Sequence, residues 1–214
     1  MKKIGILGSG MVAKALAVGF IKHGFSVMMG TREPGKINDW AAAHPGLLVR
    51  SFSETAKYGD ALVLAVKGTA ASTVLALAGG AHLAGKTIMD TTNPIADAPP
   101  VNHVLSFFTV AGESLMEKLQ SEYPEAKFVK VFNSVGNPLM VNPDFDGIKP
   151  TMFICGNDAG AKQEVKEVLD LFGWETEDLG SDRSAECIES LCILWCIPGF
   201  MHNTWMHAFK LLKK

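Results

Sequence analysis

A glycine-rich turn between an apolar strand and an apolar helix is the feature that most constrains the fold of this chain. The first twenty residues read MKKIGILGSGMVAKALAVGF, so the apolar run Lys3–Leu7 leads directly into Gly8-Ser9-Gly10-Met11-Val12-Ala13. A short run that is apolar throughout is typical of a strand buried on both faces of a parallel sheet. Two interpretations compete here: a secretory signal peptide, or the phosphate-binding turn of a nucleotide-binding fold.

The glycines decide between these interpretations. A signal peptide needs an uninterrupted apolar stretch, whereas Gly8 and Gly10 break this one early and Lys14 puts a charge in its middle. In the nucleotide-binding interpretation Gly8 permits the tight turn, Gly10 lets a pyrophosphate approach the backbone, and Ala13 lets helix and strand pack closely. We therefore expect a dinucleotide site, with a helix over residues 11–23 that Gly24 terminates.

The end of the second strand indicates which dinucleotide binds. The strand expected over residues 25–30 is followed by Thr31 and Arg32, so no carboxylate stands where an NAD-specific site places one for the ribose 2′-hydroxyl. Arg32 offers a planar fork for a phosphate, and the Thr31 hydroxyl and Lys36 can add to it. Glu33 argues against a phosphate site, because its negative charge would repel the phosphate. Taken singly, Arg32 and Lys36 could each be an ordinary surface charge. Together they favour NADP(H).

The rest of the chain alternates expected strands and helices. We predict strands over residues 61–66, 86–94, 127–136, 151–158 and 174–179, and helices over 70–78, 113–122, 159–172 and 184–212, the last interrupted near Pro198. This alternation predicts an α/β doubly wound parallel sheet of the Rossmann type with a C-terminal helical extension. We expect an NADP-binding domain at 1–180 and a helical segment at 181–214.

Ligands of such sheets bind beyond the carboxyl ends of the strands. Asn93 and Asn133 both follow strands, where a side-chain amide can hold a nicotinamide carboxamide or an acceptor carbonyl, although each can equally cap a turn. The predicted cofactor contacts are Gly8, Ser9, Gly10, Met11, Val12, Thr31, Arg32, Lys36, Ala65, Val66, Lys67, Asn93 and Pro94.

Composition and motifs narrow the function further. A net charge of −2 gives no basic surface for nucleic acid. The apolar run at 191–201 is shorter than the roughly 20 residues of a membrane span, so we expect a soluble, cytoplasmic protein. The four cysteines form no C-x-x-C pair and are expected to be buried thiols, and the histidines lack metal-binding spacing. We predict neither a metal site nor an essential catalytic acid or base.

Several segments resemble the NADP reductases that depend on coenzyme F-420, an 8-hydroxy-5-deazaflavin. The resemblance covers GILGSGMVAKALA, GTR with Lys36, TTNP, KVFNSVGNPLM, TMFICGNDAGAKQEVKEVL and RSAECIESLCILW. It implies that the glycine turn holds the pyrophosphate and that Thr31, Arg32 and Lys36 read the 2′-phosphate. It further implies a deazaflavin site against the nicotinamide, formed near Asn93-Pro94 and by Asn133, Gly136, Asn137 and Met140.

The first turn is also similar to that of pyrroline-5-carboxylate reductases and of STEAP-type metalloreductases, although the chain resembles neither the dimerisation domain of the former nor the membrane domain of the latter. Three functions follow as hypotheses. The favoured one is hydride transfer between NADP(H) and a deazaflavin, flavin or related small-molecule acceptor. The alternatives are an NADP(H)-binding redox sensor without turnover, and a reductase of a small imine or keto substrate or of ferric iron.

The apolar final region also predicts a homodimer, since large exposed apolar surfaces usually mark interfaces. The residues expected to contribute are Ile188, Leu191, Leu194, Trp195, Ile197, Phe200 and Trp205.

Overall fold

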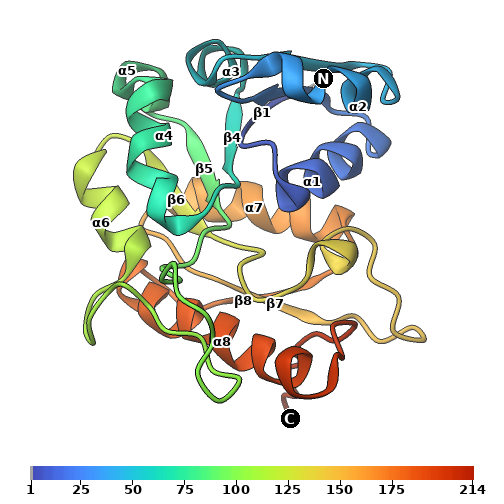
Figure 1. Cartoon of the computed structure of the whole chain (residues 1–214), viewed down its shortest axis with the longest axis vertical. Helices are drawn as coiled ribbons and strands as arrows, with labels where there is room; N and C mark the ends of the chain where they lie inside the picture. The colour runs from blue at the N-terminus through green and yellow to red at the C-terminus, as the bar shows by residue number, and fades with distance from the viewer. Residues whose placement is uncertain (1) are drawn as a thin grey trace.

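The computed structural model describes residues 2–214 and shows a six-stranded parallel sheet flanked by helices (Figure 1). The strand order is β3-β2-β1-β4-β5-β6, as in a doubly wound dinucleotide-binding fold. The strands of this sheet are β1 (Lys3–Leu7), β2 (Ser26–Gly30), β3 (Leu47–Arg50), β4 (Ala61–Leu64), β5 (Thr87–Asp90) and β6 (Lys127–Lys130). The predicted fold class is confirmed.

Helices cover both faces of the sheet, and each face has its own hydrophobic core. α1 (Met11–Lys22) and α7 (Ala159–Leu171) bury residues such as Leu16, Phe20 and Val165 in one cluster. α3 (Phe52–Tyr58), α4 (Ala71–Ala78) and α6 (Leu115–Glu122) contribute to the cluster on the other side. Burial on both faces explains why the strands read as continuous apolar runs.

The helix after the glycine turn ends where the sequence predicts. α1 stops at Lys22, and Gly24 follows in the left-handed conformation at φ 84°. The Gly24 N–H donates to the Ile21 carbonyl and the Phe25 N–H to the Phe20 carbonyl, so the last carbonyls of the helix are partnered. The chain is thereby turned into β2 beside β1.

Several short elements were not predicted. These are β3, α2 (Asn38–Ala42), α3 and α5 (Gly80–Leu83). For α3 a sequence signal exists: Ser51 and Glu54 form a capping box, each side chain accepting from the other residue's backbone N–H. The other elements have four or five residues, which is too short for a hydrophobic period to be recognised.

The last two expected strands do not join the main sheet. β7 (Thr151–Ile154) and β8 (Glu175–Asp178) pair in parallel as a separate two-stranded sheet, joined by the crossover helix α7. One antiparallel bridge, Lys130 to Cys155, links this pair to the end of β6. The expectation that all strands belong to one parallel sheet was therefore wrong for β7 and β8. β7 contacts β6 in the antiparallel direction, and at one residue pair only.

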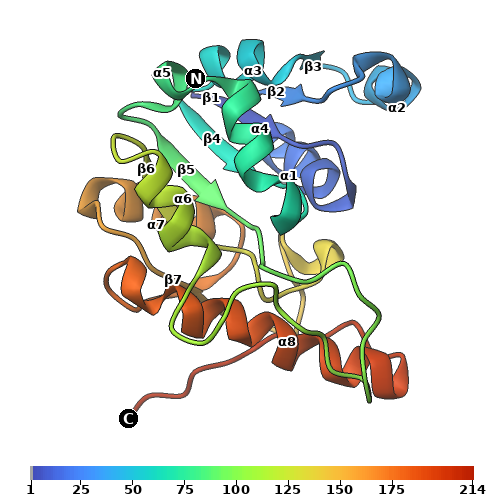
Figure 2. The same cartoon turned by 60° about the vertical axis from the view of Figure 1, so that its left-hand side comes forward.

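The C-terminal region also differs from its prediction. α8 (Ala185–His202) runs without interruption through Pro198, since its buried face, with Trp195, Cys196 and Gly199, holds it in place. It ends at Asn203 in the left-handed conformation, and the following residues are not helical, contrary to the expected helix to residue 212. The tail instead hydrogen-bonds to β7: the Thr151 N–H donates to the Phe209 carbonyl. This extended tail is visible in Figure 2.

Within the described residues, the helical stretch Asp182–His202 is long and apolar enough to cross a membrane by length and composition alone. The eleven-residue estimate from the sequence was too short, because the helix continues beyond that run at both ends. In this structure its buried side chains include Ile188, Glu189 and Cys192, which pack inside the protein.

Candidate functional site

The glycine turn has the geometry of a phosphate-binding loop. Gly8 has φ 143°, and a Cβ atom there would lie 2.1 Å from the Ala65 carbonyl oxygen, so only glycine fits. A Cβ at Gly10 would meet nothing within 4 Å, so the backbone here faces open space. The turn is thus closed toward β4 and open toward solvent, which allows a ligand to approach its backbone.

The N-terminus of α1 offers a site for an anion. Gly10 is its N-cap residue and provides no side-chain cap, and no acidic residue occupies the first turn. The backbone N–H groups at this end of a helix, with the helix dipole, attract negative charge. Met11 is 68% exposed and Val12 half-buried beside this position. A pyrophosphate fits this arrangement.

The residues expected to read the 2′-phosphate lie together at the end of β2. The Ser9 hydroxyl donates to Thr31 Oγ1 at 3.3 Å, which connects the glycine turn to this end of the site. Arg32 is exposed and forms no hydrogen bond or ion pair with any residue from 2 to 214. Lys36, in contrast, pairs with Glu33 at 2.9 Å, both side chains being exposed. Arg32 is therefore the cation best placed to meet a phosphate.

A groove of about 680 Å³ connects these features along the carboxyl ends of β1, β2 and β4. It contains most of the predicted cofactor contacts. Its lining is Gly8, Ser9, Gly10, Met11, Val12, Thr31, Arg32, Glu33, Lys36, Ile37, Phe52, Ala65, Val66, Lys67, Ala70, Thr73, Val74, Leu77 and Thr91. Phe52, Thr73 and Leu77 were not predicted, because they come from helices whose facing side depends on packing.

A second cavity, of about 590 Å³, adjoins the groove. The two share Val66, Lys67 and Thr91. Its other lining residues are Gly68, Thr92, Asn93, Ile95, Ala96, Asp97, Ala98 and Pro99. At its edge Lys67 Nζ lies 3.1 Å from Asp97 Oδ1, and both side chains are exposed. The residues after Asn93, in the segment between β5 and α6, therefore form one wall of this cavity.

The two asparagines predicted to orient ligands bind each other. Asn93 Nδ2 donates to the Asn133 carbonyl at 2.8 Å, and Asn133 Nδ2 donates to Asn93 Oδ1 at 2.9 Å and to the Ile188 carbonyl. Asn133 is buried, and its Oδ1 atom has no hydrogen-bond partner among residues 2–214. Asn93 lines the second cavity, whereas Asn133 lies behind it and supports it.

The other predicted acceptor residues lie apart from both cavities. Pro94 is buried, and its carbonyl accepts from Phe108. Gly136 lies against Trp195, whose ring would be 3.0 Å from an added Cβ. Asn137 lines a different hollow beside α1, and Met140 is a core residue whose carbonyl accepts from Trp174 Nε1.

The ionisable side chains that line the two cavities are all at the surface. These side chains are Arg32, Glu33, Lys36, Lys67 and Asp97.

Three of the four cysteines, Cys155, Cys192 and Cys196, are buried. Burial raises the pKa of Cys155 to about 12, so that it stays a neutral thiol. Cys187 is exposed, which corrects the expectation that all four are buried.

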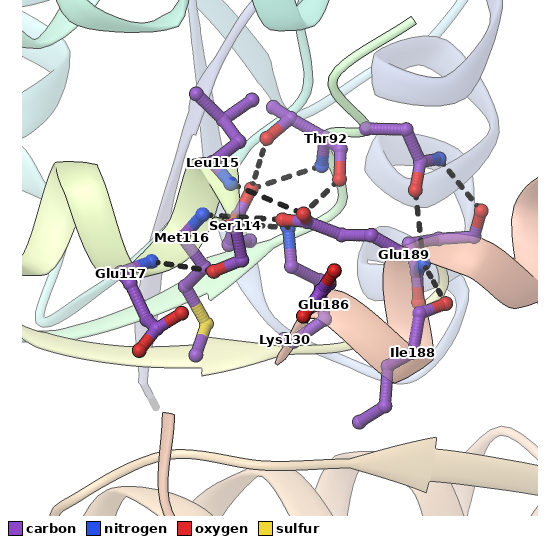
Figure 3. Close-up of polar contacts among 12 residues, drawn as sticks. Thr92, Ser114, Leu115, Met116, Glu117, Lys130, Glu186, Ile188 and Glu189 are labelled. Atoms are coloured by element: carbon purple, nitrogen blue, oxygen red, sulfur yellow. Dashed lines mark hydrogen bonds and ion pairs between the residues drawn. The ribbon is translucent and has the colours of Figure 1, made fainter. Parts of the chain in front are cut away.

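One polar cluster was missed by sequence reasoning. Asp90, Lys130 and Glu189 are completely or almost completely buried and form ion pairs next to Thr92, a residue of the second cavity. Figure 3 shows Lys130, Glu189 and Thr92 close together. The signal was present, since Lys130 interrupts the apolar run from Phe128 to Phe132 and Glu189 stands in the apolar sequence of α8. A charged residue in such a run is rarely buried without a partner.

Comparison with known proteins agrees with this geometry. Residues 3–94 match the family described as NADP oxidoreductase, coenzyme F420-dependent. A crystal structure of a candidate F420-dependent NADP reductase from Arthrobacter sp. FB24 is 31% identical, covers 100% of both chains and has a TM-score of 0.94. This chain belongs to the family of F420-dependent NADP oxidoreductases, which are NADP-dependent reductases of Rossmann type.

A second relative is a metalloreductase. Metalloreductase STEAP3 of Rattus norvegicus is 32% identical over 204 residues, which are 93% of this chain but 39% of that protein. The chain thus spans about two fifths of the length of this curated relative. An imine reductase from Aspergillus terreus, in complex with NADPH4 and dibenz[c,e]azepine, shares the fold with a TM-score of 0.64 at 19% identity, covering 89% of this chain and 59% of that one.

Proposed function

We propose that this protein passes a hydride from NADPH to a planar deazaflavin or flavin ring bound in the second cavity. The observation that carries the proposal is the shared border of the two cavities, formed by Val66, Lys67 and Thr91. Direct hydride transfer needs the reacting atoms about 3–3.5 Å apart, so the two rings would have to meet where the cavities share these residues. Likeness to the Arthrobacter protein favours coenzyme F-420 as the acceptor.

The hydrogen-bond donors of the cofactor groove match the phosphate groups of NADP(H). The uncapped N-terminus of α1 and the open backbone at Gly10 suit the pyrophosphate, and Arg32 suits the 2′-phosphate. When bound, the nicotinamide ring supplies the hydride. The chain itself orients the two ligands and keeps water from the space between them.

The lining of the second cavity supports an aromatic acceptor. Ile95, Ala98 and Pro99 give the cavity an apolar lining, and the exposed Lys67–Asp97 pair adds charged groups to it. No buried acid or base from residues 2–214 lines either cavity, which suits a transfer that depends on positioning. Reduction of an imine or ketone, in contrast, must deliver a proton together with the hydride.

Ferric iron is the second candidate acceptor. It is favoured by one observation, the 32% identity to a metalloreductase over almost the whole of this chain. A flavin in the second cavity would connect the two candidates, since it accepts a hydride and passes single electrons onward.

The test is NADPH oxidation, followed by absorbance, with coenzyme F-420, FMN, ferric citrate and a cyclic imine offered separately. We expect turnover with F-420 or FMN, and with ferric citrate only when FMN is present. The variant Ala98→Trp should fill the second cavity and abolish turnover while NADPH still binds. Ala42→Trp, on an exposed face of α2, is the matched control. Binding of NADPH without turnover of any acceptor would favour a redox sensor and contradict the proposal.

A further inference from the structure

The buried cluster behind the second cavity joins three separate segments of the chain. Lys130 Nζ, at the end of β6, donates to Asp90 Oδ2 at 2.7 Å and to the Thr92 carbonyl at 2.8 Å, and forms an ion pair with Glu189 Oε1 at 2.9 Å; Lys130, Thr92 and Glu189 are labelled in Figure 3. The ammonium group, which has three protons, is therefore surrounded by three oxygen atoms at 2.7–2.9 Å. Lys130 thus connects the end of β5, the segment after it, and helix α8.

Thr92 is the residue through which this cluster reaches the cavity. Asp90 Oδ1 accepts from the Thr92 N–H at 2.9 Å and from its hydroxyl at 2.6 Å, while the Thr92 carbonyl accepts from Lys130. All three polar groups of Thr92 are therefore held from behind. Since Thr92 and its neighbours line the second cavity, their position is set by buried charges that no ligand touches.

The charges of the cluster are balanced by a helix end. Two carboxylates face one ammonium, and the Leu115 and Met116 N–H groups, at the N-terminus of α6, donate to the Glu189 carboxylate at 3.1 Å. Although burial disfavours its charge, the two carboxylates raise the pKa of Lys130 above its ordinary value, which keeps the group charged. Each carboxylate oxygen of Asp90 and Glu189 thus has a partner within the cluster or at the N-terminus of α6.

A second connection runs from α8 to the same wall. The Ile188 carbonyl accepts from Asn133 Nδ2, and Asn133 in turn holds Asn93 through its carbonyl and side chain. Consecutive residues of α8, Ile188 and Glu189, therefore fix the neighbouring residues Asn93 and Thr92 by two different routes.

Stability alone is a poor explanation for such a cluster. Replacing a buried ion pair by apolar residues of similar volume is often neutral or stabilising, because desolvation of the charges offsets their attraction. What a completely partnered network provides is a single geometry for the groups attached to it. Here those groups are the residues that border the space where the two ligands are proposed to meet.

We propose that Lys130, Asp90 and Glu189 are positioning residues, which act through Thr92 to hold the wall formed by residues 91–93 against the nicotinamide and its acceptor. The inference rests on the proposed function, because it assigns the second cavity to the acceptor. It makes α8, which lies outside the six-stranded sheet, part of the apparatus that aligns the rings.

The test separates alignment from folding by using Thr92→Val, which keeps the shape of the side chain and removes the hydroxyl held by Asp90. Thr87→Val is the matched control, since it changes another buried threonine of the same region at the far end of β5. Thr92→Ser is the conservative variant that restores the hydroxyl. Lys130→Met is compared with Lys86→Met, whose lysine lies before β5 and donates to the Ala56 carbonyl.

The first measurement needs no turnover. Amide hydrogen exchange is followed in peptides covering residues 90–95, with and without NADP+, together with the dissociation constant of NADP+. We expect Thr92→Val and Lys130→Met to speed exchange in this segment about tenfold and to leave the NADP+ dissociation constant within about twofold, because the glycine turn and Arg32 are untouched. Thr92→Ser and the two controls should behave as the unchanged protein.

The second measurement uses FMN and coenzyme F-420 as acceptors. We expect kcat to fall about tenfold in Thr92→Val with little change in KM, and Thr92→Ser to recover it. Equal effects of Thr92→Val and Thr87→Val would overturn the proposal, as would unchanged exchange in Thr92→Val and Lys130→Met. If no acceptor is reduced, the proposed function fails, yet the exchange experiment still decides whether the cluster holds the wall.

Discussion

Arg32 is the residue that most directly sets cofactor preference. It lies exposed at the groove and has no partner among residues 2–214, so that its guanidinium is free to meet a 2′-phosphate. A hydrogen bond to a charged group contributes about 1.5–3 kcal/mol, which is roughly a tenfold effect or more on affinity. We expect Arg32→Ala to weaken NADPH binding at least about tenfold and to leave NADH binding nearly unchanged. Calorimetry with both cofactors measures this, and equal dissociation constants in the unchanged protein would contradict it.

Glu33 has the opposite effect on the same phosphate. It pairs with Lys36 at 2.9 Å and puts a negative charge beside Arg32. Exposed ion pairs contribute about 0.2–1 kcal/mol, so Glu33→Gln should tighten NADPH binding by about two- to fivefold by releasing Lys36. The gain should shrink at high salt, because screening weakens exposed charges. Glu125→Gln, far from the groove, serves as control, and a loss of NADPH affinity in Glu33→Gln would show that the glutamate instead orients Lys36.

At the scale of elements, the junction of α8 with the tail depends on Trp205. Its ring lies 2.3 Å from where a Cβ of Gly199 would be, and its centroid is 5.6 Å from that of Trp195. Its indole N–H also donates to Asn203 Oδ1. Since the side chain is half-buried, we expect Trp205→Ala to lower the free energy of unfolding by about 2 kcal/mol. Leu212→Ala, at an 84% exposed position of the same tail, should change it by less than about 0.5 kcal/mol. Urea unfolding measures both, and equal losses would disprove this role.

At the scale of the whole molecule, the apolar residues available for the predicted homodimer differ from those expected from the sequence. Ile188 and Trp195 are buried within the chain, whereas Leu194, Phe200, Met201 and Met206 are 36–65% exposed. We still expect a homodimer, now through these four exposed side chains of α8 and the tail. Light scattering at about 50 μM should give twice the mass of the chain, and Leu194→Asp with Met201→Asp should give the monomer. A monomeric unchanged protein would refute the prediction.

The sequence predicted the dinucleotide half of the molecule well. The strand Lys3–Leu7, the glycine turn and the helix after it depend on local rules: apolar runs for buried strands, glycine where the backbone must turn, and a terminating Gly24. The family was likewise recognised from motifs within single segments. These features could be read because each is contained in about twenty consecutive residues.

The second cavity, where we propose that the acceptor binds, was harder to predict, because its lining comes from distant segments. The resemblance implied a deazaflavin site near Asn93-Pro94 and at Asn133, Gly136, Asn137 and Met140. Of these residues Asn93 lines the second cavity, together with Val66 to Gly68 and other residues between Thr91 and Pro99. Nothing local in the sequence indicates that Lys130 would meet Glu189, 59 positions later. Their pairing results from how α8 packs.

What the sequence by itself determined is therefore the fold class, the position of the glycine turn and the cations beside it, since these follow from local conformation and periodicity. Only the tertiary structure decided that β7 and β8 pair apart from the main sheet, that the tail is extended, and that three charges are buried behind the second cavity. The physical reason is that buried charges and edge pairings depend on partners brought together by packing, and their free energy is not a property of any one segment.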